Sequence, residues 1–262
     1  MIVTFRDTDT HGKAVILDIS GSTISAVGSE YEFSGGNTFS TCVTRLSDTK
    51  AIVAYITAAT GLLTACVLDV SGTTITVNSE QTLTSGDADY VSVCSLDSST
   101  AVFGYRDNSD AALKAAAMTS ITTTGTFGSI VTLDNTNLSF DNVPGMPFIR
   151  KIDSSRAAIC YQTDNGNPFT IRLIIISNSG GVVTFGSSIA LSDAGYDEFP
   201  TIVVPNEALA VVLFDRAAGG GSDGLYSTAT ISGTTATYNS DQTAWEGDTV
   251  SIFASAMLKT IS

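Results

Sequence analysis

Aromatic side chains lie next to acids or amides at several places in this sequence, and such pairs have the chemistry of a sugar-binding site. An aromatic ring can stack on the apolar face of a sugar, while carboxylate and amide groups hold its hydroxyls. The candidate binding residues are Asp89, Tyr90, Phe140, Asp141, Asn142, Tyr196, Asp197 and Trp245. In the alternative interpretation, these aromatics only close the hydrophobic core between neighbouring repeats.

Acids at the same places offer a second chemistry, the hydrolysis of a glycosidic bond. That reaction needs two carboxyl groups about 5.5 Å or about 6.5–9.5 Å apart, one of them with a raised pKa. Asp89, Asp197 and Glu198 are the acids best placed for it. The similarity of the repeats favours binding over hydrolysis, so the sequence predicts no catalytic residue.

The segment from Asp7 to Gly12, Asp-Thr-Asp-Thr-His-Gly, resembles the start of a calcium-binding loop, with Asp7 and Asp9 as candidate metal ligands. His11 replaces an oxygen ligand, and a hairpin is expected where an EF-hand has a helix. An ordinary solvated turn is the other interpretation. No cofactor besides calcium is expected. Three Arg/Asp pairs near strand ends are predicted to be ion-paired loop anchors: Arg6 with Asp7, Arg106 with Asp107, and Asp215 with Arg216.

One sequence unit recurs and must position these residues. Its best copy is Leu96–Asp107: one apolar residue, a short polar turn, then an apolar run that ends in an aromatic. Such a run, entered through polar turn residues, predicts a β-strand after a tight hairpin. The copies are Leu46–Ile56, Leu96–Asp107, Ile152–Gln162, Val204–Asp215 and a split one, Leu258–Ser262 continued by Met1–Asp7.

The aromatics of these copies are Phe5, Tyr55, Tyr105, Tyr161 and Phe214, spaced 50, 50, 56 and 53 residues apart. A period of this length with about four strands predicts a β-propeller. The fold class is therefore all-β: a five-bladed propeller of four-stranded antiparallel blades. One blade is expected to combine a C-terminal inner strand with three N-terminal strands. The whole chain, 1–262, is expected to be one domain, with repeats at about 1–50, 51–100, 101–156, 157–209 and 210–262.

The second repeat illustrates the expected strands, at Ala51–Tyr55, about Leu63–Val70 and about Ile75–Leu83. A Ser-Gly-Thr-Thr hairpin turn, Ser71–Thr74, separates the last two and recurs elsewhere. A serine also recurs in the outer strand and is expected to be structural, because nucleophilic catalysis needs an adjacent base. Its copies are Ser29, Ser79, Ser129, Ser187 and Ser240.

Composition excludes some partners. The formal net charge is −14 with only 12 Lys and Arg residues, which argues against nucleic acid because phosphate binding needs clustered cations. No apolar run approaches the roughly 20 residues that span a bilayer, so no membrane insertion is expected. The N-terminus shows no recognisable signal peptide. The spacing of the four cysteines fits neither a zinc site nor a disulfide framework, which predicts buried free thiols.

The period, the Ser-Gly-Thr-Thr turns and the Ala-hydrophobic-Tyr-Arg-Asp strands resemble the propeller repeats of microbial and phage surface proteins. Among five-bladed propellers, this resemblance implies either a lectin with repeated sugar sites or a glycoside hydrolase with axial carboxylates. The main prediction is a non-catalytic module that binds a glycan or cell-surface receptor, together with other virion or surface proteins. The alternatives are a glycoside hydrolase and a decoration protein without a small ligand. The expected location is a virion or extracellular surface, although the cytoplasm is not excluded.

The expected ligand-binding face carries the loops that vary most between repeats, since variable loops on a rigid scaffold usually carry function. The longest of them is the connection Asp134–Pro147, which contains Phe140, Asp141 and Asn142. Tyr90 and Tyr196 are expected to reach it from adjacent blades.

Overall fold

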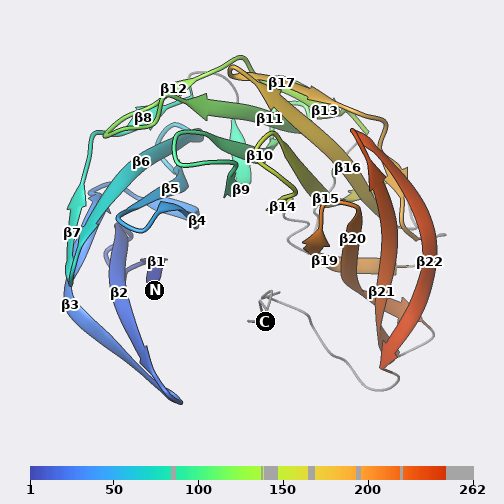
Figure 1. Cartoon of the computed structure of the whole chain (residues 1–262), viewed down its shortest axis with the longest axis horizontal. Coiled ribbons are helices and arrows are strands. Elements are labelled where there is room, and N and C mark those ends of the chain that lie inside the picture. Colours follow the sequence, from blue (N-terminus) through green and yellow to red (C-terminus); the bar gives the residue numbers. More distant parts are fainter. Residues whose placement is uncertain are drawn as a thin grey trace.

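The computed structural model describes residues 1–83, 87–136, 138, 147–164, 169–192, 196–218 and 221–245. These residues form twenty-two strands in five antiparallel sheets. The sheets follow one another around an arc, and each is built from one stretch of sequence (Figure 1). The described residues include no helix long and apolar enough to cross a membrane.

The first sheet has three strands: β1 (Ile2–Arg6), β2 (Gly12–Ser20) and β3 (Thr23–Ser34). The second comprises β4 (Thr38–Ser47), β5 (Lys50–Thr57), β6 (Leu62–Ser71), β7 (Thr74–Val77) and β8 (Gln81–Thr82). The third comprises β9 (Ala88–Ser95), β10 (Ala101–Asp107), β11 (Ala112–Thr119), β12 (Thr126–Phe127) and β13 (Val131–Asp134).

The fourth sheet comprises β14 (Phe148–Lys151), β15 (Arg156–Asp164), β16 (Phe169–Ser179), β17 (Val182–Phe185) and β18 (Ile189–Ala190). The fifth comprises β19 (Tyr196–Asn206), β20 (Leu209–Ala218), β21 (Gly221–Ser232) and β22 (Thr235–Trp245). In Figure 1, β4, β9, β14 and β19 lie nearest the centre of the arc, and β7, β17 and β22 lie at its periphery. In the second to fifth sheets the chain therefore runs from the inner strand to the outer strand.

The outer strand of the three middle sheets is interrupted, whereas the sequence predicted one continuous strand, Ile75–Leu83. In the second sheet, Val77 pairs with Leu68 and Gln81 pairs with Ala65, so the outer strand carries one extra residue. One extra residue on one of two paired strands defines a β-bulge. Asn78 bridges the gap, because its backbone amide and its side chain both donate to the carbonyl of Val67. The recurring serine Ser79 lies within this interruption and not in a ladder position.

The Ser-Gly-Thr-Thr turns are confirmed as tight hairpins. Gly72 joins β6 to β7 with a φ of 58°, and Gly233 joins β21 to β22 with a φ of 59°. A glycine has no Cβ, so it adopts this left-handed conformation without steric cost. The turns therefore fix the register of the two outer strands in each of these sheets.

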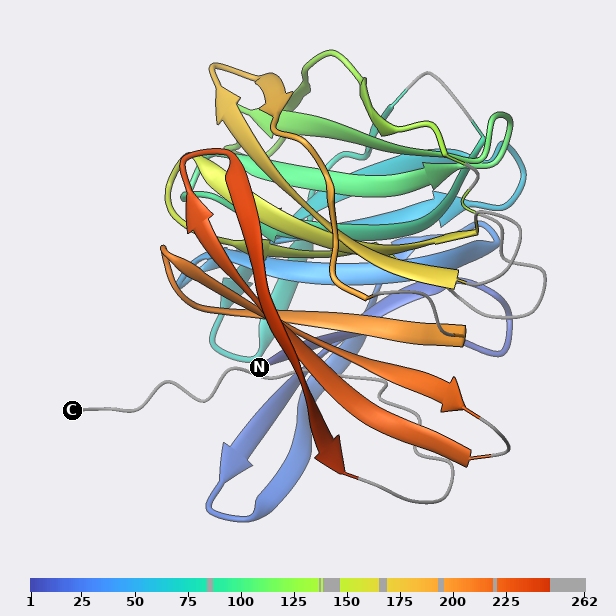
Figure 2. The same ribbon diagram turned by 90° about the vertical axis from the view of Figure 1, so that its right-hand side faces the viewer.

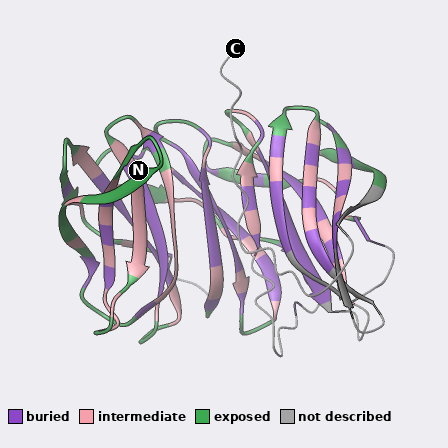
Figure 3. Cartoon of the chain, turned by 90° about the horizontal axis from the view of Figure 1, so that it is seen from below, coloured by how far each residue is buried: buried purple, intermediate pink, exposed green. Residues whose placement is uncertain are grey.

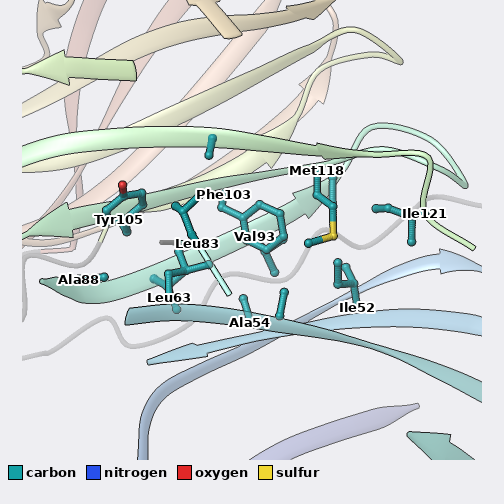
Figure 4. Packing of buried hydrophobic residues seen from close by; sticks show 14 of the residues in the cluster. Ile52, Ala54, Leu63, Leu83, Ala88, Val93, Phe103, Tyr105, Met118 and Ile121 are labelled. Carbon is teal, nitrogen blue, oxygen red and sulfur yellow. The ribbon is translucent and has the colours of Figure 1, made fainter. Parts of the chain in front are cut away.

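The hydrophobic core lies between neighbouring sheets. Figure 4 shows the cluster shared by the second and third sheets, in which Phe103 of β10 packs among Val93, Leu63 and Leu83. Four of the five aromatics that end the repeats point into these interfaces and are almost fully buried, whereas Phe5 is partly exposed. The four are Tyr55, Tyr105, Tyr161 and Phe214. The middle sheets are buried on both faces, as their mostly purple strands in Figure 3 show.

Backbone hydrogen bonds join the first sheet to the second and the second to the third at one end of the strands, and a similar bond fixes the loop after the third sheet. The carbonyl of Thr10 accepts from the amide of Thr38 at 3.0 Å, and the carbonyl of Ala111 accepts from the amide of Leu138 at 2.9 Å. Gly61 and Ala88 form the equivalent bond between the second and third sheets. We call these three contacts the backbone staples. Two of them hold the hairpin loop of one sheet against the start of the next sheet, and the third holds Ala111 against Leu138 in the connection that follows the third sheet.

The predicted fold class is confirmed: the described residues form an all-β protein of five antiparallel sheets arranged as in a propeller. The predicted inner strand that would complete the first sheet falls in residues 246–262, which lie outside the described residues. The division into a single domain stays a prediction.

Candidate functional site

Asp89 and Tyr90 lie where the inner strand β9 begins, and a bulge sets their orientation. Asp89 pairs with Arg106 of β10, and the register then shifts by one residue between Tyr105 and Arg106. Tyr90 occupies the extra position with a φ of 48°, a left-handed conformation that is unfavourable for a residue with a large side chain. Ser40 of β4 has the same conformation at the same place, with a φ of 53°. Backbone strain of this kind is often found at functional sites.

Arg106 connects this acid to the long loop that follows the third sheet. Its Nη1 lies 3.7 Å from Oδ2 of Asp89. Its Nε donates to the carbonyl of Leu138 at 2.8 Å, and its Nη1 donates to Oδ1 of Asn108 at 2.6 Å. Asn108 in turn donates to Oδ2 of Asp87 at 3.4 Å. Asp87, Asp89, Arg106 and Asn108 therefore form one polar network, which we call the β9 cluster.

Sequence reasoning assigned Arg106 to Asp107, and this pairing was wrong. Alternate residues of a strand point to opposite faces, so two adjacent side chains cannot meet. Arg106 contacts Asp89, while Asp107 contacts Lys114 at 2.7 Å. The role of a loop anchor holds for both residues, but each has a different partner.

The pKa of the Asp89 carboxyl is raised above its usual value. Burial is the main cause, because it disfavours the charged form; the Arg106 guanidinium opposes it. Burial also raises the pKa of Tyr90. A carboxyl group that holds its proton to higher pH is suited to act as a general acid.

A second acid occupies the same structural position two sheets away. Glu198 of β19 pairs with Asp215, the residue after Phe214, just as Asp89 pairs with Arg106, the residue after Tyr105. The register shift after Glu198 also matches the one after Asp89. Glu198 is thus the counterpart of Asp89. The sequence had named both Asp197 and Glu198 as candidate acids for hydrolysis and only Asp197 as a binding residue. The register places Asp197 opposite Arg216 instead.

The other predicted binding residues have different positions. Phe140, Asp141 and Asn142 lie outside the described residues. The backbones of Tyr196 and Asp197 lie at the start of the inner strand β19, and that of Trp245 ends the outer strand β22; the side chains of all three are not described. Trp245 therefore ends an outer strand, unlike Tyr90 and Tyr196, which lie where inner strands begin.

The carboxylate of Asp7 is engaged by its own hairpin. Its Oδ1 accepts from the amide of His11 at 2.9 Å, and its Oδ2 lies 3.1 Å from Nζ of Lys13. A lysine at this distance competes with a cation for the same oxygen. No group of three or more His, Cys, Asp or Glu side chains able to hold a metal ion occurs among the described residues. Calcium binding by Asp7 and Asp9 stays a prediction that this geometry does not support.

All four cysteines, Cys42, Cys66, Cys94 and Cys160, are free thiols, as predicted, and the last three are buried. Burial raises the pKa of each thiol to about 12. Because the thiolate is the reactive form, we expect slow alkylation of the native protein at pH 8 and four reactive thiols in denaturant without reductant. Mass spectrometry after iodoacetamide treatment checks this, and recovery of fewer than four thiols would indicate disulfides.

Comparison with known proteins supports the fold. No protein-family profile and no curated protein matches the sequence. Among solved structures, the K499G mutant of the NanB sialidase from Streptococcus pneumoniae matches with a TM-score of 0.55 at 15% identity, over 79% of this chain and 33% of that one. NanB in complex with 2-[(3-chlorobenzyl)ammonio]ethanesulfonate matches with a TM-score of 0.50 at 12% identity, over 82% of this chain and 41% of that one.

These identities establish a shared propeller-type fold and nothing about activity. The chain spans about a third of the length of the first sialidase. The comparison nevertheless corrects the main functional prediction, a non-catalytic carbohydrate- or receptor-binding module. The matching structures belong to an enzyme and not to a non-catalytic binding module, so the glycoside hydrolase that the sequence had ranked second becomes the proposal. Fold-level analogy had supplied these two classes, and the similarity of the repeats had ranked binding first.

Proposed function

We propose that the protein is a glycoside hydrolase whose active site lies where the inner strands β9 and β19 begin. The observation that carries this proposal is the equivalence of Asp89 and Glu198, two acids at the same register position of two inner strands. Burial raises the pKa of one of them, Asp89, which is the direction that suits a proton donor. The sialidase structures that share the fold support the same class of reaction.

The residues divide into distinct roles. Asp89 protonates the glycosidic oxygen of the leaving group, and Glu198 serves as the second carboxylate, either as nucleophile or as the base that activates water. Arg106 is a positioning residue, because it contacts Asp89 and fixes the loop at Leu138. The ring of Tyr90 stacks on the sugar. The separation of the two carboxyl groups decides whether the anomeric configuration is retained or inverted.

The Asp89→Asn variant tests the proposal. Because general acid catalysis contributes about 10²–10⁴-fold, we expect kcat/KM to fall by that factor on the best substrate from a panel of aryl glycosides that includes sialosides. Asp48→Asn, in the turn between β4 and β5, is the control and should retain full activity. Absence of turnover by the unmodified protein across the panel would contradict the proposal. So would an Asp89→Asn variant that is as active as the control.

The pH dependence gives a second test. The general acid must be protonated, so kcat/KM should fall as the pH rises through the raised pKa of Asp89. In Asp89→Asn that alkaline limb should disappear from the residual activity. A profile whose alkaline limb is the same in both proteins would assign the general acid to another group.

A further inference from the structure

The inner strand β9, which carries Asp89 and Tyr90, has one edge that pairs with no other strand of the described residues. β9 pairs with β10 and is the last strand of its sheet. An edge strand presents unpaired amides, and a buried amide without an acceptor costs free energy. Val91, the residue after Tyr90, is only 1% exposed. Its amide therefore depends on an acceptor from the protein.

The neighbouring sheet supplies this acceptor. The amide of Val91 donates to Oγ of Ser40 at 2.9 Å. Ser40 belongs to β4, the inner strand of the second sheet, and β4 contacts β9 near the centre of the arc (Figure 1). Figure 2 shows the strands of successive sheets lying in layers, so a side chain of one sheet can reach the backbone of the next. One hydroxyl thus connects the second sheet to the strand of the candidate site.

Both ends of this hydrogen bond lie in bulges that contain a left-handed residue. Ser40 has a φ of 53°, and Tyr90 has a φ of 48°. The register of β4 shifts between Phe39 and Cys42, and the register of β9 shifts beside Tyr90. Such a conformation persists only where the surrounding structure holds it. The bond to Ser40 is a restraint of this kind, because it fixes the residue that directly follows Tyr90.

The fourth and fifth sheets avoid the same free amide by using proline. Pro147, just before β14, and Pro200, in β19, occupy the register position that Val91 has in β9. Proline has no backbone N–H, so this position needs no acceptor in those two sheets. Of these three sheets, only the one that carries Asp89 keeps an amide here, and Ser40 binds it.

We propose that Ser40 is a positioning residue of the candidate active site. By holding the amide of Val91, Ser40 fixes the bulge at Tyr90, and this bulge sets the direction of the Asp89 carboxyl group. Ser40 acts through the backbone of β9 and does not touch the substrate. This role rests on the proposed function, because it concerns the placement of the general acid of that reaction.

The Ser40→Ala variant of the full chain tests this role. Loss of the hydroxyl leaves the amide of Val91 without an acceptor and releases the bulge. Because a misplacement of 1 Å can cost a factor of about 10² in rate, we expect kcat to fall by about 10–100-fold on the best aryl glycoside. KM should change much less, since the residue does not contact the substrate.

Thr44→Val is the matched control. Oγ1 of Thr44 accepts from the amide of Ser95 at 3.4 Å, so it makes the same kind of bond between the same two strands. Ser95 lies six residues after Asp89, and Thr44→Val should leave kcat unchanged. An equal fall of kcat in both variants would overturn the proposal, because it would show that only the packing of β4 against β9 matters.

Val91→Pro provides a rescue, because it copies the fourth and fifth sheets. Without the amide, Ser40 has no group to hold, so Ser40→Ala should lower kcat far less in the Val91→Pro background than in the unmodified chain. A full effect in that background would contradict the role of the hydrogen bond. The comparison of Ser40→Ala with Thr44→Val decides the question even where Val91→Pro fails to fold.

A measurement without substrate separates this role from the proposed function. Burial is the main cause of the raised pKa of Asp89, and the Arg106 guanidinium and the Tyr90 amide oppose it. In Ser40→Ala the released bulge should expose the carboxyl, so its pKa should move toward the usual value of 3.8 in a carbon-13 NMR titration. Thr44→Val should leave this pKa unchanged.

The titration and the kinetics distinguish the two ways in which the proposal can fail. An Asp89 pKa that is the same in Ser40→Ala and the unmodified protein would refute the positioning role of Ser40. A shifted pKa, together with no turnover by the unmodified protein on the glycoside panel, would leave Ser40 as the residue that places Asp89 and would refute only the hydrolase.

Discussion

Replacement of Phe103 by alanine should lower the free energy of unfolding by about 3–5 kcal/mol, the usual cost of removing a fully buried phenylalanine ring. Phe103 has no exposed surface and lies in the cluster between the second and third sheets (Figure 4). Its ring centroid is 5.1 Å from that of Phe127 on the outer strand. The side chain of Phe103 thus packs both in the middle of the interface and against its outer strand. Urea unfolding measures the stability lost when the ring is removed.

Phe185→Ala is the matched control, since Phe185 holds the position in the fourth sheet that Phe127 holds in the third. Phe185 is 40% exposed, so its loss should cost on the order of 0.5 kcal/mol. Equal losses for Phe103→Ala and Phe185→Ala would show that burial between the sheets is not what stabilises the fold.

After Phe103→Ala, Lys114→Met should have the largest effect on stability. It should lower the free energy of unfolding by about 3 kcal/mol, because it leaves a buried carboxylate without its cation. The side chain of Asp107 is only 3% exposed. Nζ of Lys114 lies 2.7 Å from Oδ2 of Asp107 and 2.8 Å from Oδ2 of Asp110. The other oxygen of Asp107 accepts from the amide and the hydroxyl of Ser109. Methionine keeps most of the volume and removes the charge, so thermal or urea unfolding isolates the ion pair.

The Lys114→Met substitution should also change how the free energy of unfolding depends on pH. Burial raises the pKa of Asp107, but the hydrogen bonds from Lys114 and Ser109 outweigh it, and the pKa is lowered overall. A lowered pKa in the folded state contributes stability above the unfolded value of about 3.9, and that contribution is lost as the pH falls through the folded pKa. Without Lys114 the pKa of Asp107 rises, so acid unfolding should begin at higher pH.

Lys13→Met provides the internal comparison, because Lys13 and Asp7 repeat the same arrangement in the first sheet. The side chain of Asp7 is 15% exposed, against 3% for Asp107. Water can therefore replace the lost contact at Asp7, and the loss of stability should be clearly smaller. A larger effect for Lys13→Met than for Lys114→Met would contradict burial as the cause.

The repeat unit predicted most of the architecture because its signals are local. An aromatic that ends an apolar run, such as Tyr105, marks the strand that is buried between two sheets, and the glycine of each hairpin turn marks a positive φ. The break in the outer strand was missed for the opposite reason. The bulge at Asn78 exists only relative to the neighbouring strand β6, where Val67 provides the acceptor.

The candidate site was predicted only in part, for a related reason. Asp89 and Tyr90 were identified from residue type, but Arg106 was assigned to its sequence neighbour because the pairing of β9 with β10 was unknown. A register error of one residue moves every side chain to the other face. Asp197 and Glu198 were both named as candidate acids from the sequence, but only the register of β19 with β20 shows that Glu198 is the counterpart of Asp89.

The backbone staples make the stability of the face that carries the variable loops independent of the side chains in those loops. The bonds from Thr38 to Thr10, from Ala88 to Gly61 and from Leu138 to Ala111 use only main-chain atoms. Loop positions such as Ala58 and Ala59 can therefore exchange their side chains freely as long as the loop length is kept. A combinatorial library at Ala58 and Ala59 should yield mostly folded proteins, which makes this face a natural place to select new specificities.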